Sequence, residues 1–594
     1  NIPNGESLSR HILYTRNYLS DLLDIDPENL EIDFEPDTFG HNINVPEILS
    51  QGNIKYYYFC RGHEDHTLFR WQSPSGKSVI AYREPFWYNA EINTDIAAAV
   101  PETCEKHNMN TMLKVYGIGD HGGGPTRRDI EKIKDMSNWP IYPQFKFGRL
   151  IDFYKKTEEL NNLPVVKDEL NFIFTGCYTS QTRIKNANKV GEDILYESEL
   201  YNSFSSIMTE YDYNNQDFAE AWENILFNQF HDIIPGSGTI DTREHALGLF
   251  QNTMAVANSR RSMALREIAK NINTTSLVKD IEINNNSTSE GAGVGFGIDD
   301  FKISQLERGR GNTRFFTIFN SGPFARKEIV EITVWDWQED LDLIQFKDNK
   351  DNIVEHQLLE SGYDDYWGHK YFKVLVNVEI PANGYRVYVL EEKDEAELDV
   401  TYSFAGQPRV DKLENYVLEN EQIKVEFDTQ KGVITSLVDK KTGTEYIDEP
   451  AGIFRFIKED ESGGGTAWRV GRYKEVESIH KDVKIRWKHQ NGDLRKSIII
   501  KTDFMDSHLK AEIFLDKESS RINYKVECDW QEKGKPGKYV PQLNFYVPFN
   551  YECENYKYDI PMGTIVRKGM NRDVPANSLV VGENKKDQKS LMMN

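Results

Sequence analysis

The chain has 594 residues, too many for a single hydrophobic core, so its length predicts several domains. Its formal net charge of −24 argues against nucleic acid and anionic membrane surfaces as partners, since both are themselves negatively charged. No uncharged apolar run approaches the ~20 residues that cross a bilayer, so we expect no transmembrane helix within the sequence.

The cysteine pattern is typical of reduced thiols. The five cysteines are widely scattered and form no Cys-x-x-Cys pair, unlike a disulfide framework. The sequence from Asn1 onward also shows no charged segment followed by an apolar one, as a signal peptide would. A signal peptide upstream of Asn1 stays open, and the reduced thiols lead us to expect a cytoplasmic protein.

Residues 1–165 alternate helical patterns with short extended runs, which predicts parallel βα units of an α/β domain. A strand is expected over 30–34, where apolar and acidic residues alternate. A second strand is expected over 111–116, running into the glycine-rich loop 117–124. Pro125 then favours the start of a helix, because proline suits a first helical turn. Since α/β proteins bind ligands at the carboxyl ends of strands, this loop is a candidate site.

Residues 166–275 are predicted to form three helices packed together. Apolar residues recur there at helical spacing and form two stripes. The stripes are Leu195, Leu200, Phe204, Ile207 and Met208, and then Phe218, Ala221, Trp222, Ile225 and Leu226. Asp241, followed three residues later by Glu244, resembles a capping box that opens the third helix.

The remainder of the chain is predicted to be a linker followed by β structure. Residues 276–312 are assigned to the linker, because the stretch inside them is rich in asparagine, serine and glycine. We assign 313–410 to a first β domain and 411–594 to a larger β-sandwich domain. The alternating runs that support this assignment include 315–319, 371–376 and 422–427.

Two polar segments carry residue types that could perform chemistry. In 35–41, Asp37 follows an extended run and could act as a nucleophile or a metal ligand. Spacing alone favours a simple turn, because aspartate and glycine commonly form turns. In 228–238, His231 and Asp232 end an amphipathic helix and could bind a cation and a substrate hydroxyl. Taken alone, the segment favours a structural role, in which His231 suits the negative end of the helix and Pro235 and Gly236 end it.

The glycine-rich loop allows further interpretations. Residues 117–122 formally contain the G-x-G-x-x-G pattern of dinucleotide sites. Asp120 would lie where a pyrophosphate approaches, and the pattern comes late in its domain, so an oxidoreductase is a distant alternative. No lysine followed by serine or threonine stands at the spacing of a P-loop. Two His-x-Asp pairs, at 63–65 and 480–482, are predicted to be solvated charge clusters.

In this order the motifs resemble the α-mannosidases of glycoside hydrolase family 38, in particular their bacterial type. The resemblance rests on segments 5–8, 36–41, 119–126, 176–181, 228–232, 466–473 and 558–564. It implies a seven-stranded α/β barrel-like catalytic domain, a three-helix bundle and large β-sandwich domains. It also implies a retaining, zinc-dependent hydrolase that acts on terminal α-mannosides through a covalent mannosyl-aspartate intermediate.

The resemblance assigns roles to individual residues. It implies that Asp37 is both the nucleophile and a zinc ligand, and that His231 is a second zinc ligand. Asp120 is the expected general acid/base, with His121 as the alternative. The residues expected to contact substrate are Asp232, His121 and Tyr178. A retaining glycosidase needs two carboxyl groups ~5–5.5 Å apart, one attacking and one transferring a proton.

One feature of the family is not found in this sequence. The resemblance implies two further zinc ligands from a His-x-Asp segment upstream of the helix that begins this chain. The pair at 63–65 follows Asp37 instead of preceding it and cannot replace that segment. Because zinc usually takes three or four protein ligands, we expect this chain to be part of a longer protein. That protein would also supply the rest of the terminal β domain.

Two function classes therefore compete. The leading hypothesis is an α-mannosidase whose partner is a mannoside or oligosaccharide, with one zinc per chain and neither nucleic acid nor membrane involved. The alternative is a noncatalytic carbohydrate-binding protein on the same fold. A homo-oligomer stays open, because large β domains often join protomers. Linkage preference is not encoded in these motifs, since side chains on distant loops decide it.

Overall fold

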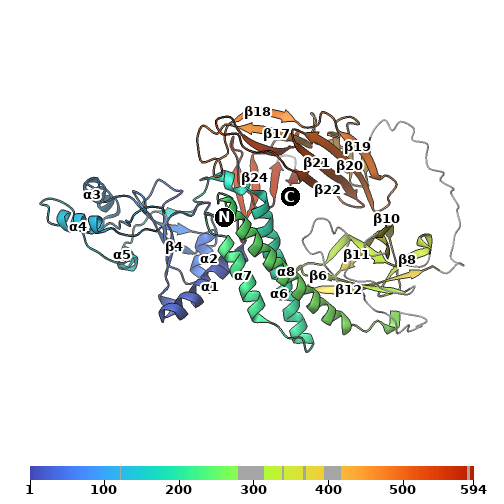
Figure 1. The fold of residues 1–594 in the computed structure, drawn as a ribbon, viewed down its shortest axis with the longest axis horizontal. Coiled ribbons are helices and arrows are strands. Elements are labelled where there is room, and N and C mark those ends of the chain that lie inside the picture. The colour runs from blue at the N-terminus through green and yellow to red at the C-terminus, as the bar shows by residue number, and fades with distance from the viewer. Residues whose placement is uncertain are drawn as a thin grey trace.

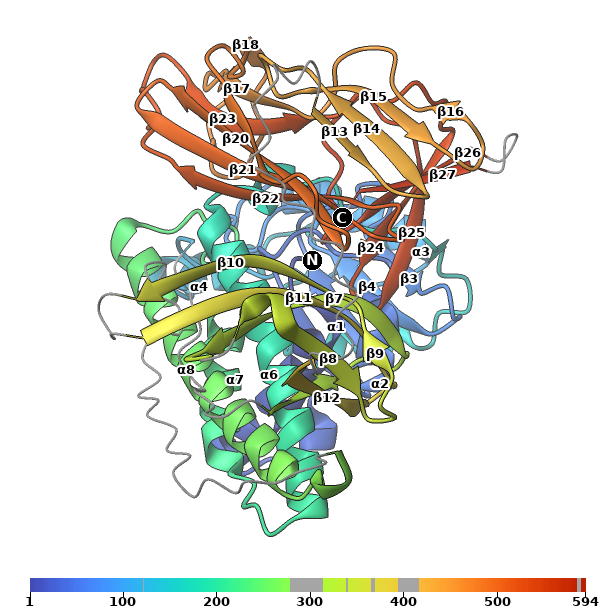
Figure 2. The same ribbon diagram turned by 90° about the vertical axis from the view of Figure 1, so that its right-hand side faces the viewer.

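A computed structural model describes residues 1–120, 122–277, 313–337, 340–364, 369–393, 416–584 and 589–593. Figures 1 and 2 show an α/β part, a group of long helices beside it, and two β regions. Almost all of the predicted linker 276–312 lies outside the described residues, as does His121. The mixed, multidomain architecture agrees with the expected fold class.

The α/β part is built on a five-stranded sheet with the order β1-β2-β4-β3-β5. Its strands are β1 (Ile32–Glu35), β2 (Tyr56–Phe59), β3 (Leu68–Gln72), β4 (Ser78–Arg83) and β5 (Val165–Val166). Strands β1, β2 and β4 run parallel, which confirms the predicted βα units. Strand β2 is fully buried, as parallel strands covered on both faces usually are. The helices of this part are α1 (Gly5–Leu23), α2 (Val45–Gln51), α3 (Ile96–His107), α4 (Arg127–Met136) and α5 (Leu150–Thr157).

The predicted strand over 111–116 is wrong. The backbone N–H of Val115 donates to the carboxylate of Glu84 at 3.1 Å, and the carbonyl of Leu113 accepts from the Tyr82 hydroxyl. Side chains at the end of β4 thus take the place of a neighbouring strand. Because this sheet has five strands among the described residues, the seven-stranded barrel is not confirmed. The helix after the glycine-rich loop does form, and Thr126 caps it.

Three long helices follow and pack on one another, namely α6 (Thr182–Met208), α7 (Asn215–Asn228) and α8 (Ile240–Lys270). The predicted stripe on α7 is buried, and four of its five residues lie in the core that the helices share. The stripe on α6 is partly wrong, because Ile207 and Met208 are 80% and 67% exposed. The buried face of α6 instead passes through Tyr201, which packs on α8. The cap of α8 is Thr239, which binds the N–H of Thr242, so the capping box at 241–244 is also wrong.

The first β region consists of two sheets, β10-β11-β7 and β6-β12-β8-β9. A common hydrophobic core joins them, as in a sandwich. The strands are β6 (Arg314–Asn320), β7 (Arg326–Trp335), β8 (Ile344–Asp348), β9 (Ile353–Val354), β10 (His356–Asp364), β11 (His369–Ile380) and β12 (Gly384–Glu392). The predicted runs 315–319 and 371–376 lie in β6 and β11 and are confirmed.

The second β region begins at residue 416 and contains four further sheets. One large core links β14, β15, β17, β20 and β21, and the predicted run 422–427 coincides with β14. The strands are β13 (Tyr416–Glu419), β14 (Ile423–Phe427), β15 (Ile434–Asp439), β16 (Thr444–Glu445), β17 (Ile453–Glu459), β18 (Tyr473–Ser478), β19 (Lys484–His489), β20 (Arg495–Phe504), β21 (Ser507–Asp516), β22 (Ile522–Asp529), β23 (Val540–Tyr546), β24 (Asn555–Ile560), β25 (Gly563–Lys568), β26 (Val580–Asn584) and β27 (Lys589–Met593).

His480 in this region is not part of a solvated charge cluster, as its sequence neighbours predicted. It is 4% exposed, and its Nε2 accepts a hydrogen bond from the backbone N–H of Phe454 at 2.9 Å. Its role is therefore structural.

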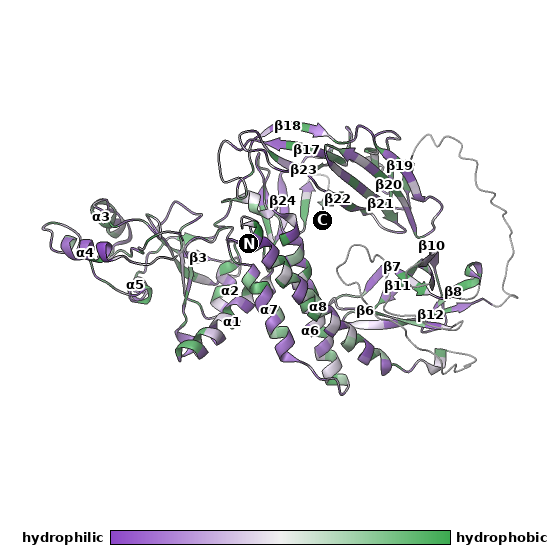
Figure 3. Cartoon of the chain, in the orientation of Figure 1, coloured by the Kyte–Doolittle hydropathy of each residue, from purple (hydrophilic) through white to green (hydrophobic). Residues whose placement is uncertain are grey.

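Hydrophobic and hydrophilic residues are interspersed along the helices in Figure 3, and no described helix is long and apolar enough to cross a membrane.

A buried ion pair fastens the second β region to the α/β part. Arg567 on β25 binds Glu169 through two parallel hydrogen bonds of 2.6 and 2.7 Å. Their side chains are only 3% and 5% exposed. The nearby loop adds a hydrogen bond of 3.0 Å from Asn44 to the carbonyl of Pro561. The segment 558–564, singled out from the sequence, thus lies at this interface.

Breaking this pair should destabilise the docked arrangement strongly. Replacing one partner leaves the other charge buried and unpaired, which costs about 3–5 kcal/mol. We expect Arg567→Met to lower the midpoint of thermal unfolding by several degrees. The control is Arg472→Met, which removes an ion pair to Asp460 whose arginine is 83% exposed. Such a surface pair contributes only ~0–1 kcal/mol. Equal midpoints for the two variants would contradict the assignment.

Candidate functional site

Asp37 lies at the edge where the parallel strands end. It follows β1 by two residues, and its carboxylate binds Nε of Arg61, which follows β2. Its other oxygen accepts a hydrogen bond of 3.2 Å from the hydroxyl of Tyr88, which follows β4. Because the carboxyl ends of neighbouring parallel strands meet at one edge, three strand ends converge on one carboxylate.

His231 approaches the same carboxylate from the helical part. It lies in the turn after α7, with its Nε2 3.8 Å from Oδ2 of Asp37 and 3.7 Å from Oδ2 of Asp232. The ring of Phe230 lies 4.3 Å from the imidazole. The Asp232 side chain is 60% exposed, so its carboxylate remains accessible to a ligand. The structure therefore brings together three of the predicted site residues.

Asp120 joins this group through a short segment beyond β4. The side-chain amide of Asn89 donates to a carboxylate oxygen of Asp120, while the adjacent Tyr88 binds Asp37. Burial, together with the nearby carboxylates of Asp37 and Asp120, raises the pKa of Tyr88 above its ordinary value. Two consecutive residues thus contact both predicted catalytic carboxylates.

Aromatic rings form a wall beside the carboxylates. The Arg61 guanidinium lies 4.6 Å from the ring centre of Trp87 and 4.7 Å from that of Phe174. Phe39 meets Phe174 edge to face at 5.2 Å, and Trp468 of the second β region lies 6.4 Å from Phe174. Rings beside a few convergent polar groups are typical of small-molecule sites.

The loop that carries Trp468 is held by backbone contacts. The N–H of Gly176 donates to the carbonyl of Trp468 at 3.0 Å, and the Ser180 hydroxyl donates to the carbonyl of Ala467 at 2.6 Å. A Cβ at position 176 would lie 2.9 Å from the Trp468 oxygen, so only glycine permits this approach. Both of the sequence segments that contain these residues, 176–181 and 466–473, belong to the site region.

Tyr178 occupies a supporting position. Its hydroxyl accepts a hydrogen bond of 3.1 Å from the amino group of Asn1 and lies under Gly40. Among the described residues, no hydrogen bond joins Tyr178 to Asp37 or Asp232. Its assignment to substrate binding stays a prediction, and so does that of His121.

A cavity of about 710 Å³ adjoins the site between α1, β1 and the turn after α7. Phe39 and His231 lie on its wall, together with Asp33 and Glu35 of β1. Burial raises the pKa of both of these carboxyl groups. Perturbed carboxyls inside a cavity next to the candidate site are typical of functional regions.

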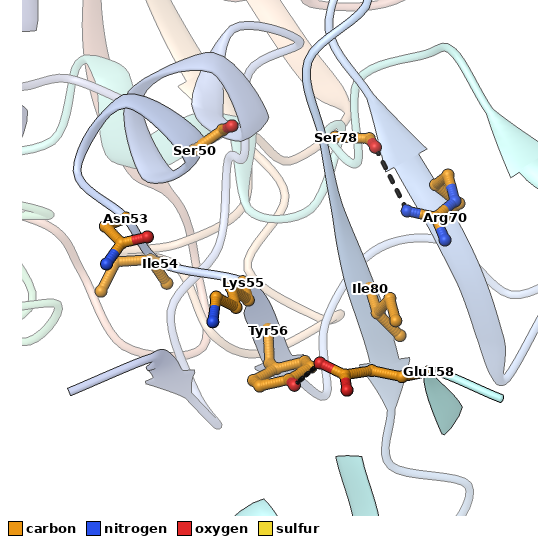
Figure 4. Close-up of a pocket in the computed structure, with 9 residues that line it drawn as sticks. All are labelled: Ser50, Asn53, Ile54, Lys55, Tyr56, Arg70, Ser78, Ile80 and Glu158. Atoms are coloured by element: carbon orange, nitrogen blue, oxygen red, sulfur yellow. Dashed lines mark hydrogen bonds between the residues drawn. The ribbon is translucent and has the colours of Figure 1, made fainter. Parts of the chain in front are cut away.

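Figure 4 shows a second, smaller pocket of about 290 Å³, which lies elsewhere on the sheet. Its lining includes Lys55, just before β2, and Ser78, the first residue of β4. It also includes Glu158, which accepts a hydrogen bond from the Tyr56 hydroxyl. These residues lie at the amino ends of the parallel strands, opposite Asp37. Since α/β sheets bind ligands at the carboxyl ends, this pocket is not the candidate site.

Asp37 and His231 are the candidate ligands for a metal ion. Two ligands of a tetrahedral zinc site with ~2.1 Å bonds are separated by roughly 3.4 Å, close to the 3.8 Å between Asp37 and His231. This pair therefore fits as two zinc ligands. Within the described part of the chain, however, no group of three or more histidine, cysteine, aspartate or glutamate side chains could hold a metal. Further protein ligands would lie outside it.

A buried polar network lies behind the turn that carries His231. The side-chain nitrogen of Gln229 lies within 3.0 Å of oxygens of Ser7, Asn188 and Glu192. The side-chain oxygen of Gln229 lies 2.9 Å from Nε2 of His11. The network thus connects α1 and α6 to the end of α7. Burial raises the pKa of Glu192 to about 7, although hydrogen bonds to its carboxylate act in the opposite direction.

Several residues that the structure places at the candidate site were not predicted from the sequence motifs. Arg61, Trp87, Tyr88 and Asn89 belong to no segment selected from the sequence. The signal that could have found them is position, because each closely follows a buried apolar run at 56–59 or 78–83. Glu192 gave no such signal, since a glutamate within a helix is usually exposed.

Three family models match the chain. They are described as the glycosyl hydrolases family 38 N-terminal domain, over residues 1–175, the alpha mannosidase middle domain, over 173–274, and the glycosyl hydrolases family 38 C-terminal domain, over 418–593. Together they account for the α/β part, the long helices and the second β region.

The chain is also similar to individual proteins named as alpha-mannosidases. Alpha-mannosidase G of Dictyostelium discoideum is 24% identical over 591 residues, which cover 96% of this chain and 50% of that protein. Alpha-mannosidase of Saccharomyces cerevisiae is 29% identical over 258 residues, which cover 40% of this chain and 24% of the yeast protein. The chain thus spans half or less of the length of these relatives. The crystal structure of an alpha-mannosidase from Enterococcus faecalis superposes with a TM-score of 0.73 at 18% identity, covering 98% of this chain and 70% of that one. This likeness shows a shared fold.

The network around Glu192 predicts a pH-dependent stability. Because its pKa is raised from 4.5 to about 7 in the folded protein, the protonated form stabilises the fold fully below pH 4.5. That stabilisation is lost as the pH rises to about 7 and amounts to roughly 3 kcal/mol. Glu192→Gln lacks this titration. The difference between its unfolding midpoint and that of the wild type should therefore shift in favour of the variant between pH 5 and pH 8.

The matched control is Glu244→Gln, which changes an exposed carboxylate on α8. Its midpoint should follow that of the wild type across the same pH range in thermal scans. If Glu192→Gln and the wild type kept a constant difference at every pH, Glu192 would not titrate as described.

Proposed function

Because the chain belongs to glycoside hydrolase family 38, we propose that its full-length protein is a retaining, zinc-dependent α-mannosidase acting on terminal α-mannosides of oligosaccharides or glycosides. The observation that carries the proposal is the meeting of Asp37 and His231, which are distant in sequence, at one strand edge. The names of the matching relatives support the choice of mannosides.

Asp37 is the proposed nucleophile. Its carboxylate attacks the anomeric carbon of the mannoside, and the bond from that carbon to the leaving oxygen breaks. The contacts from Arg61 and Tyr88 hold the carboxylate in one orientation, which favours attack along a defined line. The product is a mannosyl ester of Asp37.

Asp120 is the proposed general acid/base, and His121 is the alternative. In the first step the acid protonates the departing oxygen, and in the second its conjugate base removes a proton from water. That water attacks the anomeric carbon and frees Asp37, so the configuration at this carbon is retained. The side-chain amide of Asn89 holds one carboxylate oxygen of Asp120.

Asp37 and His231 would together hold the zinc ion. When bound, zinc would supply a Lewis acid that polarises substrate oxygens. The exposed carboxylate of Asp232 accepts hydrogen bonds from substrate hydroxyls, and the rings of Phe39, Phe174 and Trp468 exclude water from one side of the sugar.

The five cysteines are free, which supports a cytoplasmic location.

The second candidate function is a noncatalytic carbohydrate-binding protein on the same fold. One observation favours it, because the described residues supply only two of the three or four protein ligands that zinc usually takes. This alternative predicts binding of mannosides without turnover.

Zinc should be necessary for turnover. Elemental analysis of the full-length protein should give about one zinc per chain, as a single catalytic site requires. A chelator should then abolish hydrolysis of a nitrophenyl α-mannoside, and added zinc should restore it. His231→Ala should lower both zinc content and turnover, whereas His508→Ala, which changes a 65% exposed histidine on β21, should change neither. Mannoside binding with no turnover and no zinc would favour the alternative.

The leaving group distinguishes Asp120 from His121. Loss of a general acid slows the departure of a poor leaving group by about 10²–10⁴-fold but affects an activated one far less. Asp120→Ala should therefore lose most of its kcat/KM on a methyl or disaccharide mannoside and keep most of its kcat/KM on a dinitrophenyl mannoside, because kcat/KM reports the first step. The pattern should be absent from His121→Ala. Finding it in His121→Ala alone would transfer the role to His121.

A further inference from the structure

The turn that carries His231 and Asp232 is anchored at its start. Within the turn, the carbonyl of Phe230 accepts hydrogen bonds of 2.9 and 3.1 Å from the N–H groups of Ile233 and Ile234. Two side chains bind other elements. Asn228 donates to the carbonyl of Ala246 on α8 at 2.9 Å, and Gln229 enters the buried network of α1 and α6.

The amide of Gln229 is held in one orientation. Its oxygen faces His11, while its nitrogen faces the side chains of Ser7, Asn188 and Glu192. An amide oxygen only accepts hydrogen bonds and an amide nitrogen only donates them, so these partners together prevent a flip. Gln229 is 8% exposed, and water has little access to replace a lost partner.

Glu192 is the centre of this network. One oxygen of its carboxylate accepts hydrogen bonds from the Asn4 N–H at 2.9 Å, the Ser7 hydroxyl at 2.6 Å and the Gln229 amide at 2.9 Å. Glu192 is 3% exposed, and within the described part of the chain no salt bridge joins it to a basic residue. Burying a carboxyl group without a basic partner destabilises a fold, so stability alone does not account for this residue.

We infer that Glu192 is a positioning residue for the candidate site, acting through Gln229 to fix the turn that presents His231 and Asp232 to Asp37. The inference rests on the proposed function. Gln229 precedes His231 by only two residues. A rotated Gln229 amide or a shifted end of α7 would therefore displace the imidazole of His231. Outer partners of this kind typically contribute 10–100-fold to metal affinity or activity.

The test measures the kinetics and the local dynamics of four variants of the full-length protein. Glu192→Ala should lower kcat/KM on a nitrophenyl α-mannoside by about 10–100-fold, with a lower kcat per folded molecule. Gln229→Leu should do the same. Glu192→Gln should restore most of the activity, because its amide oxygen can accept the same hydrogen bonds. The control is Asn202→Ala on the same helix, α6. Asn202 is completely buried and donates to the Ser198 carbonyl, so its loss should lower the unfolding midpoint but leave kcat unchanged.

Hydrogen exchange gives a readout that does not require activity. Peptides covering 229–236 should exchange faster in Glu192→Ala and Gln229→Leu, and at the wild-type rate in Asn202→Ala. Unchanged exchange in these peptides, or an unchanged kcat with a lowered unfolding midpoint, would overturn the inference. A wild-type protein without mannosidase activity would instead sink the proposed function, and the exchange data would still decide whether Glu192 holds the turn.

Discussion

The site depends on the close approach of a strand end and a helix end. Asp37 belongs to the sheet and His231 to the long helices, yet their side chains lie 3.8 Å apart. Each is held from its own side. Arg61 and Tyr88, at the ends of adjacent strands, contact Asp37, while the network of Glu192 and Gln229 holds the turn of His231. A shift of the helices relative to the sheet would separate the pair, so the packing of the two parts is also the geometry of the site.

The second β region contributes to that geometry although its sequence carries few chemical motifs. The loop with Trp468 enters the aromatic wall because Gly176 has no Cβ to keep it away. The buried pair of Arg567 and Glu169 then fixes the whole region against the α/β part, with two charge-assisted hydrogen bonds at 2.6 and 2.7 Å. Without these contacts, Trp468 would no longer be held beside Phe174 in the aromatic wall.

Much of the fold and of the candidate site could be predicted from the sequence. Some residues carry a local signal, and their motifs follow one another in a distinctive order along the chain. Asp37 after an extended run and His231 at a helix end are such cases, and the structure brings them together. The strand expected over 111–116 failed for a physical reason, since its backbone binds the side chains of Tyr82 and Glu84 in place of another strand. The position of Tyr88 after a buried apolar run could have pointed to this residue. Glu192 could not be predicted, because its role comes from contacts between segments far apart in the chain, and a helical pattern contains no record of such contacts.

In the proposed mechanism Asp37 becomes covalently attached to the sugar, and trapping that ester tests the mechanism most directly. A fluorinated mannosyl fluoride slows the second step of a retaining glycosidase more than the first, so the intermediate accumulates. Mass spectrometry of the digested full-length protein should then find one fluoromannosyl group on the peptide that contains Asp37, with fragment ions placing it on that residue. A label on another carboxylate, or turnover without any label, would contradict the account.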